Sequence, residues 1–521
     1  MRFASKHTLP SLGWVILKNI RIQVLIVSLI AIWMHASTSI ANAHPAQPAG
    51  PAWQLPSEWP DRVIASPGAD PQTSFSVTWR TSATVSSAIA EIVEASPDSR
   101  FDLMATPQNA NYERVDPEAA LYAHNRDGTP NFGLAAVHYY STTFENLEPD
   151  TLYAYRVRGD EGAWSEWFQI RTAPANGPVS FLYYGDAQYG IRSHVARVFR
   201  QGLLSSPNAD FVVHAGDLVN KGDRDREWAE WFAAGDFIHA MIPVVPVAGN
   251  HEYLDTERGG SKDGKAVLTE LWRPQFTLPV ETTLPDNLHE TVYDLRYGPD
   301  LHLFVLDSSS PLWGEQMSWL KTKSAASDAT WKIVAMHHSP FRPGLQGYEN
   351  APARGEYHRD RQEAFLVTAK AAEIDMVLAG HNHSYTRASF GRELGGGLPI
   401  QTQAELIEAA HPVELVIVVS IAGAMSGTMT DQRFSTGNRK KFGSDLALQR
   451  WANNTPTYQA IQVIGKRLSY QSYLATGEIY DEFEMEKSSD GPTKLTNGAI
   501  VGTPSRRFET TGPYRDKNDL R

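Results

Sequence analysis

The pattern of hydrophobic and polar positions changes once along the chain, near residue 174. Before that point, short segments such as 74–79 and 153–157 alternate between apolar and polar residues. Alternation with a period of two predicts half-buried β-strands, and turn-forming residues separate these segments. Residues 61–174 are therefore predicted to form a small all-β sandwich, preceded by a Pro- and Ala-rich linker at residues 44–60.

From residue 178 onward, short apolar runs each end in polar residues, and helix-like stretches such as 193–204 lie between several of them. Buried strands that alternate with helices predict an α/β core, and ligands gather at the carboxyl ends of its strands. This core is predicted to span residues 178–482, with runs 415–423, 458–464 and 468–474 closing a second sheet. Residues 483–521 are predicted to be a polar tail.

The polar residues at the predicted strand ends are oxygen and imidazole donors. They are Asp186, Asp217, Asn250, His251, His337, His381 and His383. Such donors suit borderline or hard metal ions, and the absence of cysteine excludes thiolate ligands and a cysteine nucleophile. Two cations about 3.5–4 Å apart could hold a hydroxide and clamp a phosphoryl group during in-line attack.

These motifs also carry a family resemblance. The order and spacing of Gly216-Asp217, Gly249-Asn250-His251-Glu252, His337 and Gly380-His381-Asn382-His383 resemble the calcineurin-like metallophosphoesterases. The run 380–387 and a fibronectin type III-like upstream segment, with its corner at 147–153, make the chain similar to purple acid phosphatases. The resemblance covers about residues 61–482. It implies a four-layer αββα metallophosphoesterase sandwich, of the α/β class, after the small all-β sandwich.

The resemblance implies a role for each residue. Asp217 would bridge two metal ions, which could be Fe, Zn or Mn. Asp186 and His383 would hold the first ion, and Asn250, His337 and His381 would hold the second. His251 would remain outside the coordination shell, stabilise the transition state and protonate the leaving oxygen. Metal-bound hydroxide would attack a small-molecule phosphate monoester, without a covalent phosphoenzyme.

Two residues depart from the family pattern. Purple acid phosphatases place a tyrosine ligand three residues after the bridging Asp, whereas this chain has Asn220 there, so no purple charge-transfer colour is expected. Most other members carry Asp-x-His in the first motif, whereas this chain has Asp186-Ala187-Gln188. Gln188 could bind metal through its amide oxygen or hydrogen-bond a bound water. The first metal site is therefore expected to be weaker than usual.

Several residues close to these motifs in the sequence could have more than one role. Adjacent residues on a strand point in opposite directions, so only one of His337 and His338 should reach the metal. We prefer His337 as the ligand, with His338 structural or lining the pocket. His358 and Arg361 could meet a substrate phosphate, or they could belong to an ordinary solvated surface.

The first 43 residues resemble an export signal. Their only charged side chains are four Lys and Arg residues, an apolar run spans 22–34, and Ala41-Asn42-Ala43 offers a cleavage site. The run is shorter than the ~20 residues of a membrane span, so the mature protein is expected to be periplasmic or extracellular, without a transmembrane helix. An uncleaved anchor is the alternative.

The net charge of the chain indicates which kinds of partner it can bind. Removing the four basic residues from 47 Lys and Arg, with 59 Asp and Glu retained, changes the net charge from −12 to −16. Nucleic acid is therefore not an expected partner, because its phosphates attract basic surfaces.

Two other functions remain open. A phosphodiesterase could use the same metal core, because the rim of the pocket decides between the two reactions. A cell-envelope binding protein with an idle metal site is the second alternative, which the substitutions Gln188 and Asn220 permit. His251 argues against an idle site, because a structural metal site does not need it.

Overall fold

The computed structural model describes residues 52–116, 135–159, 164–254, 267–340, 359–391, 410–424, 450–452 and 455–498. All of these residues belong to one unit, Gly50–Arg521. The predicted export signal and the candidate residue His358 lie outside the described residues. Among the described helices, none is long and apolar enough to cross a membrane.

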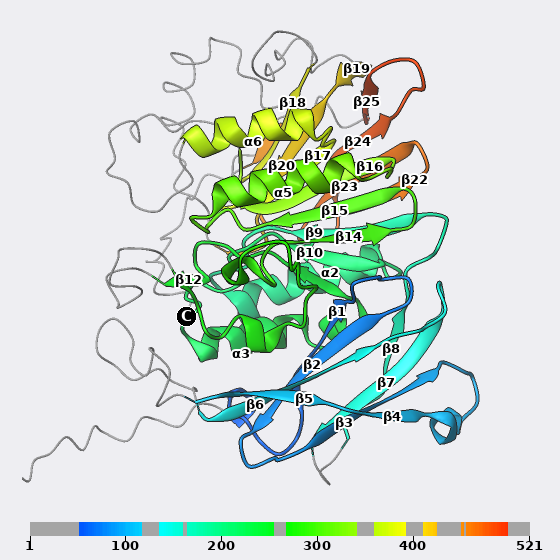
Figure 1. Cartoon of the computed structure of the whole chain (residues 1–521), viewed down its shortest axis with the longest axis vertical. Coiled ribbons are helices and arrows are strands. Elements are labelled where there is room, and N and C mark those ends of the chain that lie inside the picture. Colours follow the sequence, from blue (N-terminus) through cyan, green and yellow to red (C-terminus); the bar gives the residue numbers. More distant parts are fainter. Residues whose placement is uncertain are drawn as a thin grey trace, which may run out of the picture. The chain divides into compact units, whose positions relative to one another are not determined.

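The N-terminal part consists of two four-stranded antiparallel sheets, as the alternating pattern predicts (Figure 1). One sheet has the order β1 (Asp61–Pro67), β2 (Phe75–Ser82), β6 (Val137–Phe144) and β5 (Asn111–Val115). The other has the order β4 (Thr106–Asn109), β3 (Ala88–Glu94), β7 (Leu152–Gly159) and β8 (Phe168–Arg171). Aromatic side chains fill the space between them, with Trp79 stacked on Tyr140 at 5.9 Å between ring centroids.

An eight-stranded sheet forms the first half of the α/β core. Its order is β11 (Val244–Pro246), β10 (Phe211–His214), β9 (Val179–Tyr184), β22 (Thr457–Ile464), β23 (Arg467–Leu474), β24 (Ile479–Glu486), β25 (Thr493–Asn497) and β19 (Ala410–Val413). Strands β9, β10 and β11 run parallel, and β22 joins β9 antiparallel. The parallel strands therefore end at one edge.

A seven-stranded sheet forms the second half. Its order is β14 (Tyr293–Tyr297), β15 (Leu301–Leu306), β16 (Trp331–His338), β17 (Met376–Gly380), β20 (Leu415–Val419), β18 (Tyr385–Phe390) and β21 (Arg450–Ala452). Strands β15, β16, β17 and β20 are parallel. The prediction that 415–423 belongs with 458–474 is wrong, because β20 hydrogen-bonds to β17 whereas β22 and β23 extend the other sheet.

Helices cover the outer faces of the two sheets (Figure 1). Helices α5 (Trp313–Ala325) and α6 (Arg359–Ala371) cover the seven-stranded sheet, and α2 (Ala196–Ser205), α3 (Asp225–Gly235) and α4 (Phe237–Met241) pack on the other side. Successive residues of β15 point to opposite faces, so Phe304 packs with α5 while Leu303 joins the core between the sheets. The result is the predicted four-layer αββα arrangement.

The prediction that a polar tail begins at residue 483 is wrong. Strand β24 continues to Glu486, and β25 follows at Thr493–Asn497. Met485 and Leu495 are opposite one another in this pair, and both are fully buried. In these two strands single apolar residues alternate with polar or charged ones, so the composition of the segment is polar. One face of each strand is nevertheless buried in the core.

Shorter elements complete the described chain. They are the paired strands β12 (Tyr253–Leu254) and β13 (Val267–Leu268), a π-helix at Ile191–Val195, and 3₁₀ turns at Ala52–Gln54, Phe101–Met104, Arg273–Gln275 and Asp286–Leu288.

Candidate functional site

The predicted site residues come together where the two sheets meet. Asp186, Asp217 and Asn250 follow β9, β10 and β11 in one sheet. In the other sheet, His337 lies near the end of β16, and His381 and His383 follow β17. The N–H of His381 donates to both carboxylate oxygens of Asp186, at 3.0 and 2.7 Å, which joins the two sheets at this edge.

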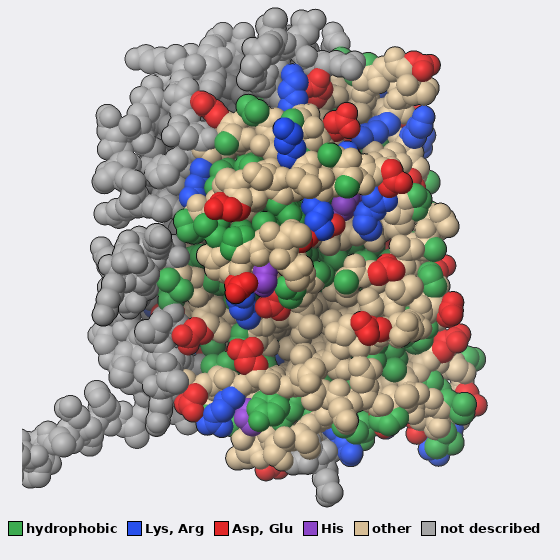
Figure 2. All heavy atoms as spheres, in the orientation of Figure 1, with side chains coloured by type: hydrophobic (Ala, Val, Ile, Leu, Met, Phe, Trp, Pro, Cys, Tyr) green, Lys and Arg blue, Asp and Glu red, His purple; other side chains and the backbone are tan. Residues whose placement is uncertain are grey.

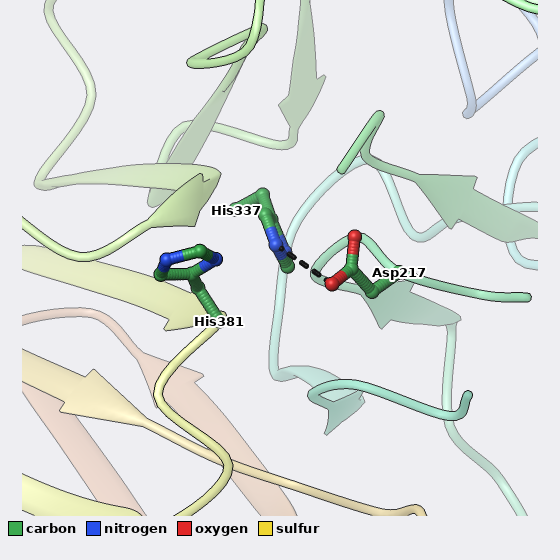
Figure 3. Close-up of side chains that lie close together, drawn as sticks. All are labelled: Asp217, His337 and His381. Atoms are coloured by element: carbon green, nitrogen blue, oxygen red, sulfur yellow. Dashed lines mark ion pairs between the residues drawn. The ribbon is translucent and has the colours of Figure 1, made fainter. Parts of the chain in front are cut away.

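Asp217, His337 and His381 form one group that could hold a metal ion (Figure 3). His337 Nε2 lies 3.1 Å from Asp217 Oδ2. Asn250 Oδ1 lies 3.0 Å from His337 Nε2 and 2.9 Å from His381 Nδ1. His337 Nδ1 is 2.9 Å from the carbonyl of Ala215, to which its N–H donates. This bond holds a proton on Nδ1 and turns Nε2 toward the site, so Nε2 is the nitrogen that could bind a metal ion.

Asp186, Asp217 and His383 form the second group. His383 Nε2 lies 3.6 Å from Asp186 Oδ1. Burial lowers the pKa of His383 to about 4, so its imidazole is neutral at pH 7 and can donate a lone pair. Asp217 belongs to both groups, which is the arrangement expected of a bridging carboxylate.

Gln188 lies between these ligands. Its Nε2 donates to Asp217 Oδ2 at 2.9 Å and lies 2.7 Å from His383 Nε2. Its Oε1 is buried and has no hydrogen-bond partner among the described residues. In this orientation the amide holds the carboxylate and the imidazole in place through its nitrogen, and its oxygen is left for another partner.

Buried carboxylates give the site its electrostatic character. Burial, followed by the repulsion of Asp217, raises the pKa of Asp186 to about 8, and the same two causes raise that of Glu252 to about 8. Burial also opposes the ionisation of Asp217, but His337 and His251 outweigh it and lower its pKa. Among the described residues, the basic side chains that lie beside the carboxylates of Asp186 and Asp217 are histidines.

The raised pKa values of Asp186 and Glu252 show that burial without a nearby cation disfavours their ionised forms, and this bears on whether metal ions fit. Burying a carboxylate is costly unless a positive charge compensates it. A cation bound between Asp186, Asp217 and the imidazoles would supply that charge, and the donor set matches the preference of borderline and hard ions. The residues therefore fit a metal centre.

The backbone of the site is held in an unusual conformation. Asp217, His381 and His383 have φ angles of 51°, 71° and 50°, a region that residues other than glycine rarely adopt. Such strain persists where the surrounding structure enforces it, and it concentrates at functional sites. Glu252 supplies part of this support, because its carboxylate accepts the N–H groups of Asp217 and Gly249 at 3.0 and 2.8 Å.

Glycine is required beside two of these residues. A Cβ atom on Gly216 would lie 2.5 Å from His337 Nδ1, and one on Gly249 would lie 2.3 Å from the backbone nitrogen of Asp217. Any side chain at either position would push a candidate ligand away.

His251 borders the two groups without being part of either. Its backbone N–H donates to Asp217 Oδ1 at 2.9 Å, and its Nε2 lies 3.8 Å from Asp217 Oδ2. Its Nδ1–H donates to the carbonyl of Asn220, at 2.5 Å. The side chain is 22% exposed, whereas Asp217 beside it is buried, so the imidazole can reach a molecule that enters from solvent.

His338 and Arg361 contact the loop after β15. His338 Nδ1 lies 2.9 Å from Ser308 Oγ, and its ring centroid is 4.2 Å from that of His381. Arg361 Nη1 donates to the carbonyl of Ser310 at 3.0 Å. Neither residue belongs to the two metal groups, so the geometry favours His337 over His338 as a ligand.

Asp307 and Ser308 also lie near the site, although the sequence patterns described above did not predict them. They follow β15, and Asp307 Oδ2 accepts a hydrogen bond from the Tyr253 hydroxyl at 2.5 Å, next to Glu252. The available signal is the same as for the other clusters, because an apolar run at 301–306 ends directly in these polar residues.

Comparisons with known proteins find two family models that match successive parts of the chain. The family model described as "Calcineurin-like phosphoesterase" matches residues 179–385, and that described as "Purple acid Phosphatase, N-terminal domain" matches residues 60–172. The first match includes Asp186, Asp217, Asn250, His337 and His381.

Relatives and solved structures extend the comparison. An uncharacterized protein of Mycobacterium tuberculosis is 25% identical over 393 residues, which cover 67% of each chain. A purple acid phosphatase of Glycine max is 24% identical over 330 residues, 60% of this chain and 66% of that protein. The alignments thus span about two thirds of these relatives.

In structure, a purple acid phosphatase from yellow lupin seeds covers 88% of this chain with a TM-score of 0.59 at 15% identity, and 78% of its own length is matched. The structure of PhoD covers 87% of this chain and 94% of its own, with a TM-score of 0.58 at 14% identity. These likenesses show a shared fold. The chain therefore has a region that matches the purple acid phosphatase N-terminal domain, followed by a region that matches the calcineurin-like phosphoesterase domain, and these homologues indicate a metal-dependent phosphoesterase.

Proposed function

We propose that this protein hydrolyses phosphate monoesters at a centre of two metal ions. Asp217 would bridge the ions, Asp186 and His383 would hold the first, and Asn250, His337 and His381 would hold the second. The observation that carries the proposal is that two groups of potential ligands share Asp217, with the ligand atoms of each group within 4.8 Å of one another. The relatives named purple acid phosphatases support a phosphate monoester as substrate.

Two bound cations would lower the pKa of a water molecule and neutralise charge on the phosphoryl oxygens. The protein's own residues would orient the reaction. The Nδ1–H bond from His251 to the Asn220 carbonyl fixes the imidazole, so that its Nε2 faces the side of Asp217. From there His251 would stabilise the transition state and deliver a proton to the leaving oxygen.

The first metal position would be the weaker one. Gln188 supplies a neutral amide where most members of the wider family have an imidazole, and in this structure it presents nitrogen to Asp217. Asn220 provides no phenolate for a ferric ion. Fe, Zn and Mn are all compatible with the oxygen and nitrogen donors.

A small phosphate ester suits the surface better than nucleic acid does. Figure 2 shows Lys and Arg side chains interspersed with Asp and Glu side chains over the visible face. The chain carries a formal net charge of −12.

The location of the protein is a separate proposal. The basic and apolar N-terminal segment supports export to the periplasm or the exterior of the cell. Fractionation of cells that express the full chain would test this location.

One experiment tests the function. The protein is analysed for bound metals, and its turnover of 4-nitrophenyl phosphate and bis(4-nitrophenyl) phosphate is measured before and after chelation. We expect two metal ions per chain, faster turnover of the monoester, and loss of both activities on chelation. Faster turnover of the diester would identify a phosphodiesterase. Bound metal without turnover of either ester would favour a binding protein, and full activity in metal-free protein would refute the proposal.

The role of His251 is tested separately. His251→Ala should retain both metal ions and lose about 10²–10⁴-fold in kcat. His289→Ala is a matched control, because His289 has 21% side-chain exposure and lies outside the site. If the His251 variant were as active as the parent, the assigned role would be wrong.

A further inference from the structure

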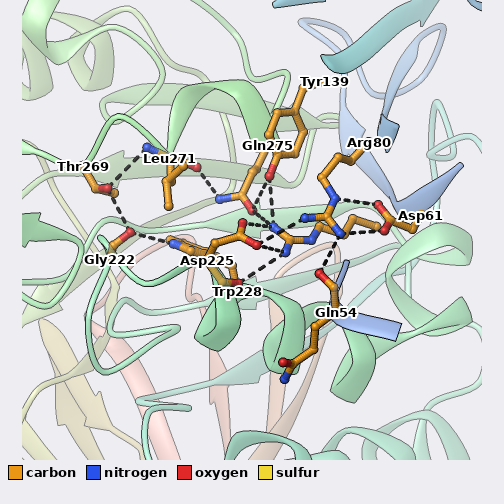
Figure 4. A network of polar contacts seen from close by, with 11 residues as sticks. Gln54, Asp61, Arg80, Tyr139, Gly222, Asp225, Trp228, Thr269, Leu271 and Gln275 are labelled. Atoms are coloured by element: carbon orange, nitrogen blue, oxygen red, sulfur yellow. Dashed lines mark hydrogen bonds and ion pairs between the residues drawn. The ribbon is translucent and has the colours of Figure 1, made fainter. Parts of the chain in front are cut away.

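A buried ion cluster connects the N-terminal β-sandwich to the phosphoesterase domain (Figure 4). Arg62 of β1 donates to both carboxylate oxygens of Asp225 at 2.8 Å, and it also contacts the Tyr139 hydroxyl at 3.0 Å and Gln275 Oε1 at 3.2 Å. The side chains of Arg62 and Asp225 are both only 3% exposed. Arg80 of β2 adds a longer contact to Asp225, at 3.3 Å.

The backbone of β1 is distorted at Arg62. The register between β1 and β2 shifts between Asp61 and Ile64, and Arg62 has a φ of 52°. A bulge of this kind turns one side chain away from the regular alternation of the strand. A positive φ at a non-glycine residue is costly and persists only where other contacts enforce it, as the bidentate bond to Asp225 does here.

Asp225 begins α3, and the loop before it leads back to Asp217. This loop contacts His251 twice. The Asn220 carbonyl accepts the Nδ1–H of His251 at 2.5 Å, and the Gly222 N–H donates to the His251 carbonyl at 2.8 Å. The Gly222 carbonyl in turn accepts from Trp228 Nε1 of α3 at 2.8 Å.

The loop has little freedom to take another path. Thr269 Oγ1 donates to the Gly222 carbonyl at 2.9 Å, so this carbonyl has two donors. A Cβ atom on Gly222 would lie 2.9 Å from the Glu252 Cα. If the start of α3 moved away from the sandwich, the buried carboxylate of Asp225 would lose its bidentate bond to Arg62. Leaving a buried charge without its partner is strongly unfavourable. The position of Asp225 therefore constrains the loop that holds His251.

We infer that Arg62 and Asp225 are positioning residues for His251, so that the N-terminal sandwich sets the orientation of an imidazole in the phosphoesterase domain. The inference rests on the proposed role of His251. It gives the sandwich a part in catalysis although none of its residues belongs to the two described metal groups.

The test uses the full chain and the variant Arg62→Lys. Lysine keeps the charge but cannot make the bidentate bond to Asp225. We expect kcat for 4-nitrophenyl phosphate to fall about tenfold, with KM and metal content unchanged, because small displacements of a reacting group are costly. Hydrogen exchange at the Gly222 amide should become faster. Arg156→Lys is the control, because Arg156 pairs with Glu91 inside the sandwich at 2.7 Å.

A double-mutant cycle separates positioning from a general loss of stability. In a His251→Ala background, Arg62→Lys should change kcat by less than about twofold, because the residue it positions is absent. An equal loss in both backgrounds would overturn the inference and leave the proposed function standing. Full activity of His251→Ala alone would instead refute the proposed role of His251.

A second variant covers the case in which Arg62→Lys does not fold. Asp225→Asn keeps the shape of the carboxylate and removes its charge, and it should give the same pattern of kcat and Gly222 exchange. If a folded variant of either residue left both kcat and Gly222 exchange unchanged, the inference would be wrong.

Discussion

The carboxylate of Glu252 accepts a hydrogen bond from the backbone N–H of Asp217, with 3.0 Å between Oε2 and N. The same oxygen accepts the Gly249 N–H at 2.8 Å. One buried side chain therefore fixes the backbone of the residue shared by both metal groups, together with the turn that leads to Asn250. Partners of this kind affect metal affinity although they do not touch the metal.

Glu252→Gln should weaken metal binding. The amide oxygen could still accept the Asp217 and Gly249 N–H groups, but the NH₂ group would face the N–H of Val219, which Glu252 Oε1 accepts at 3.3 Å in the parent. Two donors facing one another would displace the side chain. We expect a loss of about 10–100-fold in metal affinity, measured by titration of metal-free protein. Glu270→Gln, at an exposed position nearby in the sequence, should bind metal like the parent. Unchanged affinity in the Glu252 variant would show that its hydrogen bonds do not position Asp217.

Gln188→His should strengthen the first metal site. An imidazole at this position would complete the Asp-x-His motif and add a ligand beside His383. We expect tighter binding of the more weakly held ion, seen as a higher metal content at limiting metal. Gln188→Leu, which removes the 2.9 Å bond to Asp217, should lower it. Equal metal content in parent and both variants would mean that this side chain does not contribute.

His239 should make stability depend on pH away from the metal site. It is buried against Trp231, and burial lowers its pKa from 6.5 to about 3. Between these values the unfolded chain binds a proton that the folded protein does not, so His239 lowers stability as the pH falls from about 6.5 toward 3.

Urea unfolding of the parent and His239→Leu checks this effect. The difference in unfolding free energy between the two should shift in favour of the variant by up to about 1.4 kcal/mol for each pH unit below about 6. His289→Leu, at a partly exposed histidine, should follow the parent. A difference that stays constant between pH 7 and pH 5 would contradict the prediction.

Leu495→Ala should destabilise the protein although it lies in a segment that reads as polar. Leu495 is fully buried opposite Met485, so its truncation leaves a cavity worth about 2–4 kcal/mol. Lys494→Ala, one residue earlier and exposed, should change stability by less than about 0.5 kcal/mol. Thermal or urea unfolding measures both. Equal stability of the two variants would place β25 outside the cooperative unit.

Sequence patterns predicted much of the fold because strands and their ends are local features. Apolar runs that end at Gly185-Asp186 and Gly216-Asp217 are visible in the chain, and parallel strands bring such ends to one edge. Other features could not be predicted from the sequence, because they depend on contacts between distant segments. Residues 493–497 alternate a single leucine with polar residues, so only the partner strand shows that Leu495 is buried. The choice between His337 and His338 depends on which ring faces Asp217, and the sequence leaves both possible.

The sequence alone determined the chemical kind of the site: carboxylate, amide and imidazole donors at strand ends, with no sulfur. Only the tertiary structure decided how they meet, because β9 and β17 lie in different sheets and their ends come together only when the sheets pack. It also decided that Arg62 binds Asp225, 163 positions later. Neither relationship leaves a local trace in the chain, since both depend on contacts between segments far apart in sequence.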